Sequence, residues 1–159
     1  TKKLTKMGIK NFQGKRDSSQ NKNEEQILVS DYMTTKLITF KAEDSLDHVI
    51  ALLIKNKISG GPVVNDNNQL IGIISERDIV ERVVAKGLPP KGIKAKDIMT
   101  KNPTTIEPNK DIYDALVKLK DNDIRHLPVV LGNKLVGFFT EAQINGDTTC
   151  RVRLNGVAV

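Results

Sequence analysis

The amino-acid sequence predicts an α/β protein of the α+β type, with two β-α-β-β-α repeats packed face to face in pseudo-twofold symmetry. The main observation is a repeat: Asp31-Tyr32-Met33-Thr34 recurs 66 residues later as Asp97-Ile98-Met99-Thr100, and Pro62-Val63-Val64 recurs at that offset as Pro128-Val129-Val130. The second is that short β-branched runs alternate with helical periodicity in both copies. One such unit buries too little apolar surface alone, so two packed copies are expected.

An extended run and a capped helix open each copy. Leu37–Phe40 is short, β-branched and aromatic, which predicts a strand or an extended segment. Ser45 is suited to cap a helix, because the apolar residues from Leu46 to Ile54 follow the period of 3.6 residues. In the second copy Asp111 is the expected cap, and an apolar stripe follows it at residues 112–119.

A hairpin and a second helix complete each copy. The runs Pro62–Val64 and Leu70–Ile74 predict two strands around a turn whose Asn and Asp residues tolerate positive φ. Glu76–Lys86 predicts a helix that ends at Gly87. The corresponding helix of the second copy is expected to be cut short by Gly146.

The chain carries 25 basic and 19 acidic residues, a net charge of +6, and most of the excess lies at the N-terminus. Residues 1–26 hold seven basic and three acidic side chains, whereas residues 27–146 are nearly balanced at 16 and 15. This basic arm is polar and lacks aliphatic periodicity, so it is expected to be mostly disordered. A solubilising tail is favoured, and contact with nucleic acid is the weaker alternative.

The expected organisation has five parts: the arm at 1–26, a first repeat at 29–88, a linker at 89–96, a second repeat at 97–146, and a tail at 147–159 that can add a strand. No apolar run approaches the roughly 20 residues of a membrane-spanning helix, and the N-terminus lacks the apolar stretch of a secretory signal. A cytoplasmic protein without membrane contact is therefore expected. Cys150 is the single cysteine and, with two histidines, leaves too few soft ligands for structural zinc.

Several motifs follow one another in a fixed order: the two Asp-x-Met-Thr segments, Ile-Ser-Gly-Gly-Pro-Val-Val at 58–64, Ser-Glu-Arg-Asp at 75–78, and Ile-Arg-His-Leu-Pro-Val-Val at 124–130. Over about residues 29–146 they resemble a tandem pair of cystathionine-β-synthase (CBS) domains. The resemblance implies a regulatory module that binds an adenosine nucleotide (AMP, ADP or ATP) or S-adenosylmethionine between its repeats. It also implies a homodimer, an effector protein that receives the signal, and no catalytic cofactor.

The resemblance implies a ligand site shared by both repeats. In the family, a Ser/Thr-x-x-Asp segment places its Asp on the ribose hydroxyls, and Ser75 and Asp78 match that segment. A carboxylate suits this role because it offers paired acceptors to a vicinal diol. The alternative is local, with Ser75 capping the helix and Asp78 complementing its dipole. The other residues expected at this site are Thr105, Ile124, Arg125 and Gly60.

Arg125 is the residue expected to meet a phosphate, since a guanidinium pairs with phosphate in bidentate fashion. Gly60 stands where some relatives place a basic residue, so little phosphate binding is expected from that side. The alternative for Arg125 is a surface ion pair with Asp123, which contributes little. Ile124 offers an apolar wall, a role equally consistent with ordinary core packing.

A second, weaker site is expected at the symmetric position, formed by Thr39, Ile58, Ser59, His126, Thr140 and Gln143. Gln143 replaces the ribose-binding carboxylate with a neutral amide that has one acceptor oxygen. A protonated His126 can meet a phosphate, although a packed, hydrogen-bonded histidine is the commoner case. One competent site is therefore expected, with the other weak or vacant.

The expected function is sensing and not catalysis. The sequence contains no Gly-rich P-loop, no Gly-x-Ser-x-Gly and no His-Glu-x-x-His motif. The competing function is a structural dimerisation or adaptor module without a small ligand, whose basic arm contacts nucleic acid or a partner protein. Aromatic residues make up only 4% of the chain and Trp is absent, so no platform for stacking bases is indicated.

Overall fold

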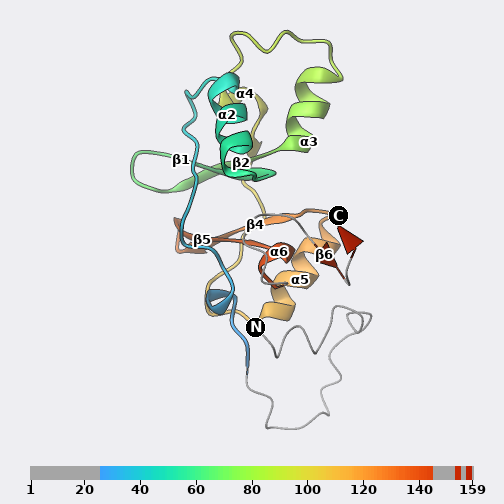
Figure 1. Ribbon diagram of the computed structural model, residues 1–159. Helices are drawn as coiled ribbons and strands as arrows, with labels where there is room; N and C mark the ends of the chain where they lie inside the picture. Colours follow the sequence, from blue (N-terminus) through green and yellow to red (C-terminus); the bar gives the residue numbers. More distant parts are fainter. Residues whose placement is uncertain (1–25, 145–152, 155–156, 159) are drawn as a thin grey trace.

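The structure is a computed structural model that describes residues 26–144 and the two short strands at 153–154 and 157–158. Figure 1 shows two stacked units, with the chain crossing from one to the other more than once. The N-terminal arm, Gly146 and Cys150 lie outside the described residues. Within the described ranges, no helix is long and apolar enough to cross a membrane.

The elements follow the expected order in both repeats, except that the first strand of each repeat is an extended segment with one bridge residue, Phe40 or Ile106. Those of the first half are η2 (Val29–Asp31), α2 (Leu46–Asn56), β1 (Gly60–Val64), β2 (Leu70–Ser75), α3 (Glu76–Ile79) and η3 (Val80–Val84). Those of the second half are α4 (Ala95–Ile98), β3 (Thr100–Lys101), α5 (Ile112–Asp121), β4 (His126–Leu131), β5 (Lys134–Thr140) and α6 (Glu141–Ile144). In the tail, β6 (Arg153–Leu154) pairs with β7 (Val157–Ala158) in antiparallel fashion.

The two long helices begin at the predicted caps. Ser45 Oγ accepts a hydrogen bond from the His48 N–H and opens α2, while Asp111 Oδ1 accepts from the Tyr113 N–H and opens α5. Each cap satisfies one of the backbone donors that a helix leaves free at its start. The apolar stripes of both helices then pack on the hairpin of their own repeat.

The two hairpins repeat the same pairing. In the first, Gly60 faces Ser75 and Val63 faces Gly72; in the second, His126 faces Thr140 and Val129 faces Gly137. Both hairpins carry an irregularity one residue further on, and both strands β1 and β4 receive a parallel bridge, from Phe40 and Ile106. The internal repeat predicted from the sequence is therefore visible at the level of individual hydrogen-bonded pairs.

The first segment of each repeat packs on the other repeat. Val29 of η2 is fully buried in the core cluster around α5, β4 and β5, whereas Ala95 and Ile98 of α4 are buried in the cluster around α2, β1 and β2. The strand β3 joins β2 to make a three-stranded sheet, and Thr34 exchanges two backbone hydrogen bonds with Phe138 of β5. We call residues 29–34 and 95–100 the crossing segments.

The helix expected over 76–86 is divided into a short α-helical turn, α3, and a π-helical turn, η3. The Ala85 N–H bonds to the Val80 carbonyl, five residues back, and Gly87 then takes φ +65. Within this turn Arg82 reaches sideways, and its guanidinium donates to the carbonyls of Ile98 and Met99 at 2.7 and 2.9 Å. The helix thus departs from its expected regular form where it binds a crossing segment.

Close packing at Gly72 gives a test of this crossing. A Cβ added there would lie 2.6 Å from Met99 Sδ and 3.0 Å from the Thr100 carbonyl oxygen. We expect Gly72→Ala to lower the free energy of unfolding by about 1–3 kcal/mol through overpacking, measured by urea denaturation. The cost should be smaller in a Met99→Ala background, where the thioether is gone. Equal costs in the two backgrounds would show that the segment does not pack as described.

Candidate functional site

Two of the cavities that lie between the repeats contain most of the expected site residues. Cavity A, of about 720 Å³, is lined by β2 and α3 of the first repeat and by residues 100–104 and 123–126 of the second half. Cavity B, of about 960 Å³, is lined by residues 31–38, by Asn56, Ile58, Gly60 and Pro62, and by residues at the ends of β4, β5 and α6. Both walls of each cavity therefore come from different repeats, as ligand sites between repeats require.

In cavity A the Asp78 carboxylate is nearly buried at the start of α3, with 9% of the residue exposed. Its Oδ2 accepts hydrogen bonds from the Ser75 N–H at 2.8 Å and the Ser75 hydroxyl at 3.1 Å. Its Oδ1 lies 3.5 Å from Thr100 Oγ1 and 3.6 Å from a guanidinium nitrogen of Arg82. This carboxylate therefore joins the first repeat to a crossing segment.

Ser75 and Asp78 form a reciprocal capping box at the start of α3. The local role proposed for the pair is therefore present in the structure. It does not use up the carboxylate, because two oxygens provide about four acceptor positions. The Oδ1 contacts with Thr100 and Arg82 are long, and of these two neighbours Thr100 lines cavity A whereas Arg82 does not. Capping and binding of a diol can thus use different sides of one carboxylate.

Arg77 spans the rim of cavity A. Its Nε donates to Glu81 Oε1 at 2.8 Å, and its Nη1 lies 3.4 Å from Asp123 Oδ2 of the other repeat. Hydrogen bonds to Glu81, and then to Asp123, raise the pKa of the guanidinium above its ordinary value. The ion pair considered between Arg125 and Asp123 is not formed, because Asp123 pairs with Arg77.

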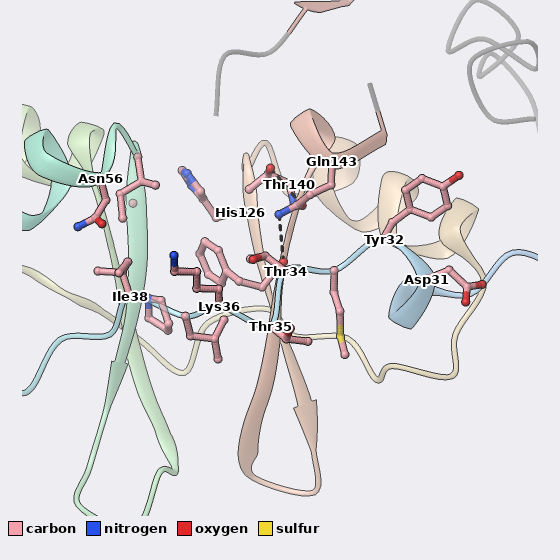
Figure 2. Close-up of a pocket in the computed structure, with 16 residues that line it drawn as sticks. Asp31, Tyr32, Thr34, Thr35, Lys36, Ile38, Asn56, His126, Thr140 and Gln143 are labelled. Atoms are coloured by element: carbon pink, nitrogen blue, oxygen red, sulfur yellow. Dashed lines mark hydrogen bonds between the residues drawn. The ribbon is translucent and has the colours of Figure 1, made fainter. Parts of the chain in front are cut away.

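Cavity B has the same plan with a different polar group (Figure 2). Gln143 takes the place of Asp78: its Oε1 accepts from the Thr140 N–H at 2.5 Å and from the Thr140 hydroxyl at 3.3 Å. Its Nε2 donates to the Phe138 carbonyl at 3.4 Å. Figure 2 shows the crossing chain at Thr34–Lys36 running between the two hairpins, with Lys36 directed toward the space that His126 and Gln143 also face.

His126 stands between the cavities and lines both. Only 8% of it is exposed, its ring stacks on Phe138 at 5.7 Å between centroids, and its Nε2 shares a 2.7 Å hydrogen bond with Ser59 Oγ. Burial, together with the nearby Arg125 charge, lowers the pKa of this imidazole to about 4, and Asp78 opposes the shift. The packed, hydrogen-bonded state is thus the one in the structure, and the ring is neutral at pH 7.

The structure brings most of the expected residues together. Cavity A gathers Ser75, Asp78, Ile124 and Arg125, and cavity B gathers Ile58, His126, Thr140 and Gln143. Four expected residues fall elsewhere: Gly60, Ser59, Thr105 and Thr39. Gly60 lines cavity B instead of cavity A, and Ser59 lines cavity A instead of cavity B. Thr105 lines a separate cavity, where its carbonyl accepts a hydrogen bond from Lys118.

Other residues were not anticipated. Thr100, Asn102, Pro103 and Thr104 line cavity A, whereas Thr39 is not among the residues that line cavity B. Asn102 adopts φ +48, which turns the chain over the cavity just after β3. The repeat offered a way to predict that residues 102–104 line a cavity. They follow the Asp-Ile-Met-Thr motif, and the segment that follows the first such motif, Thr35–Ile38, lines cavity B.

Within the described ranges, no group of three or more His, Cys, Asp or Glu side chains is placed to hold a metal ion. What the described residues do form is a pair of related clefts between two α/β repeats. Such an arrangement defines a tandem-repeat binding module. The CBS domain family matches residues 29–85 and 95–145, and the chain belongs to that family.

Relatives of known sequence and structure agree with this assignment. The uncharacterized protein MJ1225 of Methanocaldococcus jannaschii is 31% identical over 86% of this chain and 51% of its own length. A homoserine O-acetyltransferase of Methanosalsum zhilinae is 32% identical over 75% of this chain but only 23% of its own length. The chain thus spans about half of the first relative and less than a quarter of the enzyme.

Two similar solved structures are complexes with adenosine-containing ligands. CBSX2 in complex with AMP superposes with a TM-score of 0.67 at 27% identity, covering 76% of this chain and 94% of CBSX2. The CBS domain pair of protein MJ0100, in complex with 5′-methylthioadenosine and S-adenosyl-L-methionine, has a TM-score of 0.69 at 27% identity. That match covers 77% of this chain and 95% of the MJ0100 pair.

The buried imidazole predicts a pH dependence of stability. In the unfolded chain His126 titrates near 6.5 and in the folded protein near 4, so only the unfolded state gains a proton between these values. Stability should therefore be full above pH 6.5 and decline by about 3 kcal/mol as the pH falls to 4. Urea denaturation across this range, compared with His126→Gln, measures that contribution, and an NMR titration reports the pKa directly. An imidazole that titrates near 6.5 in the folded protein would contradict the assignment.

Proposed function

We propose that this chain is a regulatory ligand-sensing module that binds an adenosine nucleotide or S-adenosylmethionine in the cavities between its repeats. The observation that carries the proposal is the Asp78 carboxylate, nearly buried on the wall of a cavity that both repeats line. The likeness to CBS pairs in complex with AMP and with S-adenosyl-L-methionine supports an adenosine-containing ligand. The module has no catalytic role in this proposal.

Each part of cavity A has a chemical use. Asp78 Oδ1 accepts hydrogen bonds from the ribose hydroxyls, and these bonds replace its long contacts with Thr100 and Arg82. Ile73 and Ile124 offer apolar walls for the base. The backbone of residues 102–104 supplies polar groups at the edge of the same cavity, where a base edge can pair with them.

The stronger site in this proposal is cavity A, although cavity B is the larger. The reason is chemical: Asp78 is an anionic acceptor for two hydroxyls, whereas the single oxygen of Gln143 is already held by Thr140. Hydrogen bonds to a charged acceptor contribute roughly 1.5–3 kcal/mol, about twice the contribution of neutral ones. Cavity B is the weaker site.

The walls of cavity A belong to both repeats. A ligand that draws these walls together therefore changes how the two repeats pack against each other. In this proposal the protein is a homodimer, and the change in packing is the signal that the homodimer passes to an effector protein. A ligand shifts such an equilibrium only by its difference in affinity for the two packing states. The contacts of Asp78 and Arg82 with residues 98–100 are the ones that differ between them.

A thermal-shift panel tests the proposal on the wild type and on Asp78→Asn. The amide keeps one oxygen for the Ser75 N–H but loses the anionic acceptor, so the helix cap survives while ribose recognition fails. Adenosine, AMP, ADP, ATP and S-adenosylmethionine are the probes. A probe at 100 times its dissociation constant should stabilise the wild type by about 2.7 kcal/mol and raise the midpoint by a few degrees.

Two matched variants sharpen this test. Ser75→Ala removes the hydroxyl next to the carboxylate but keeps the carboxylate, so most of the thermal shift should remain. Gln143→Ala should reduce the shift far less than Asp78→Asn does. If the Asp78 and Gln143 variants lose the shift equally, the assignment of the stronger site to cavity A is wrong. If no probe shifts the wild type, the protein is a structural dimerisation module instead.

A further inference from the structure

The ionised groups around cavity A carry information about the ligand beyond its adenosine part. The cavity is lined by four carboxylates and two guanidinium groups: Glu76, Asp78, Glu81 and Asp123, with Arg77 and Arg125. Its wall therefore has a net charge of −2, and the balance is still −1 when Arg82 behind Asp78 is added. A cavity with this net negative charge repels an anionic group on a ligand.

The positive charge on the rim is not free. Arg77 is held from both sides, by Glu81 in its own helix and by Asp123 of the other repeat. A phosphate that recruits this guanidinium must first displace one of the two carboxylates. Arg125 and Glu76 form no ion pair with the described residues, and Arg125 is a single cation that lines the cavity together with the carboxylates of Glu76 and Asp78.

The carboxylates repel an anionic group on the ligand wherever the ligand lies within cavity A. A cavity of about 720 Å³ is roughly 10 Å across, which is comparable with the distance over which physiological salt screens a charge. Any group attached to the 5′ carbon of a bound adenosine therefore remains within the field of these carboxylates. Asp78 is the buried carboxylate among them, and its charge is screened less than the exposed charges of Glu81 and Asp123.

Cavity B shows that this charge is specific to one half of the pair. The ionised groups on its wall are Asp31 and Lys36, which balance one another, and the group at the position of Asp78 is the neutral Gln143. Lys36 makes no ion pair with the described residues and points toward the cavity. Two cavities related by the repeat thus differ in charge, and only cavity A is acidic.

We propose that cavity A selects an adenosine ligand whose 5′ substituent is uncharged or cationic, such as a thioether or a sulfonium, over one that carries 5′ phosphates. The inference rests on the proposed function and narrows its ligand class. A sulfonium gains from the same carboxylates that repel a phosphate, and a thioether avoids the repulsion.

Isothermal titration calorimetry of the full chain with adenosine, S-adenosylmethionine and AMP tests the selectivity. Adenosine and S-adenosylmethionine should each bind at least tenfold more tightly than AMP, at a site that Asp78→Asn removes. The preference should narrow as salt is raised, because screening weakens the repulsion of AMP. Adenosine carries no charge, and its affinity should change little over the same range of salt.

The double variant Glu81→Gln/Asp123→Asn tests the cause. It removes two carboxylates from the rim and releases Arg77, so the wall becomes neutral and AMP should bind within about threefold of adenosine. Both residues are exposed, so the fold is retained. The matched control is Asp47→Asn/Asp66→Asn, which removes two exposed carboxylates that line neither cavity and should keep the wild-type preference.

The outcomes separate this inference from the proposed function. AMP that binds as tightly as adenosine at the site lost in Asp78→Asn would overturn the selectivity and leave the adenosine site standing. A preference that survives in the rim variant would show that shape and not charge selects the ligand, which also overturns the inference. Failure of all three probes to bind would overturn both.

Discussion

Each repeat of this protein completes the core of the other, and the rest of the structure depends on that exchange. Val29 is fully buried among the residues of the second repeat, and Ala95 and Ile98 are buried among those of the first. Burying a side chain the size of Val29 or Ile98 stabilises a fold by about 1.5–3 kcal/mol, so neither half keeps its stability when the crossing segments are withdrawn. The backbone pairs of Thr34 with Phe138 and of β3 with β2 fix the register of the exchange.

The crossing also produces the binding clefts. Immediately after each crossing segment the chain must return to its own repeat, and the residues that make the return, 34–38 and 100–104, become one wall of each cavity. The opposite wall is the start of a short helix, where Asp78 or Gln143 caps the backbone and faces the cavity. A ligand held between these walls therefore touches the connections that hold the repeats together. Binding and packing are coupled in this architecture because they share residues such as Thr100 and Asp78.

Much of this could be predicted from local patterns, and the rest depends on contacts between distant segments. The 66-residue offset predicts both hairpins, and the types of Ser45 and Asp111 predict the helix starts, because capping acts within three residues. The offset and a resemblance to a known family also bring Asp78 and Ile124 to one cavity. The local sequence around Val29 does not show that its side chain is buried in the core of the second repeat. The partner of Asp123 was missed for the same reason, because Arg77 lies 46 residues away. Ser59 and His126, 67 residues apart, were expected in one site, but not as a hydrogen-bonded pair.

The central claim is that one ligand bridges both repeats, and hydrogen–deuterium exchange with saturating adenosine tests it most directly. The account predicts slower exchange in three stretches together: Ser75–Asp78 of the first repeat, Asn102 and Thr104 after the crossing segment, and residues 123–126 of the second repeat. Simultaneous protection would show that the cavity closes on its ligand from both sides. Protection confined to one repeat, or a pattern identical with and without adenosine, would contradict it.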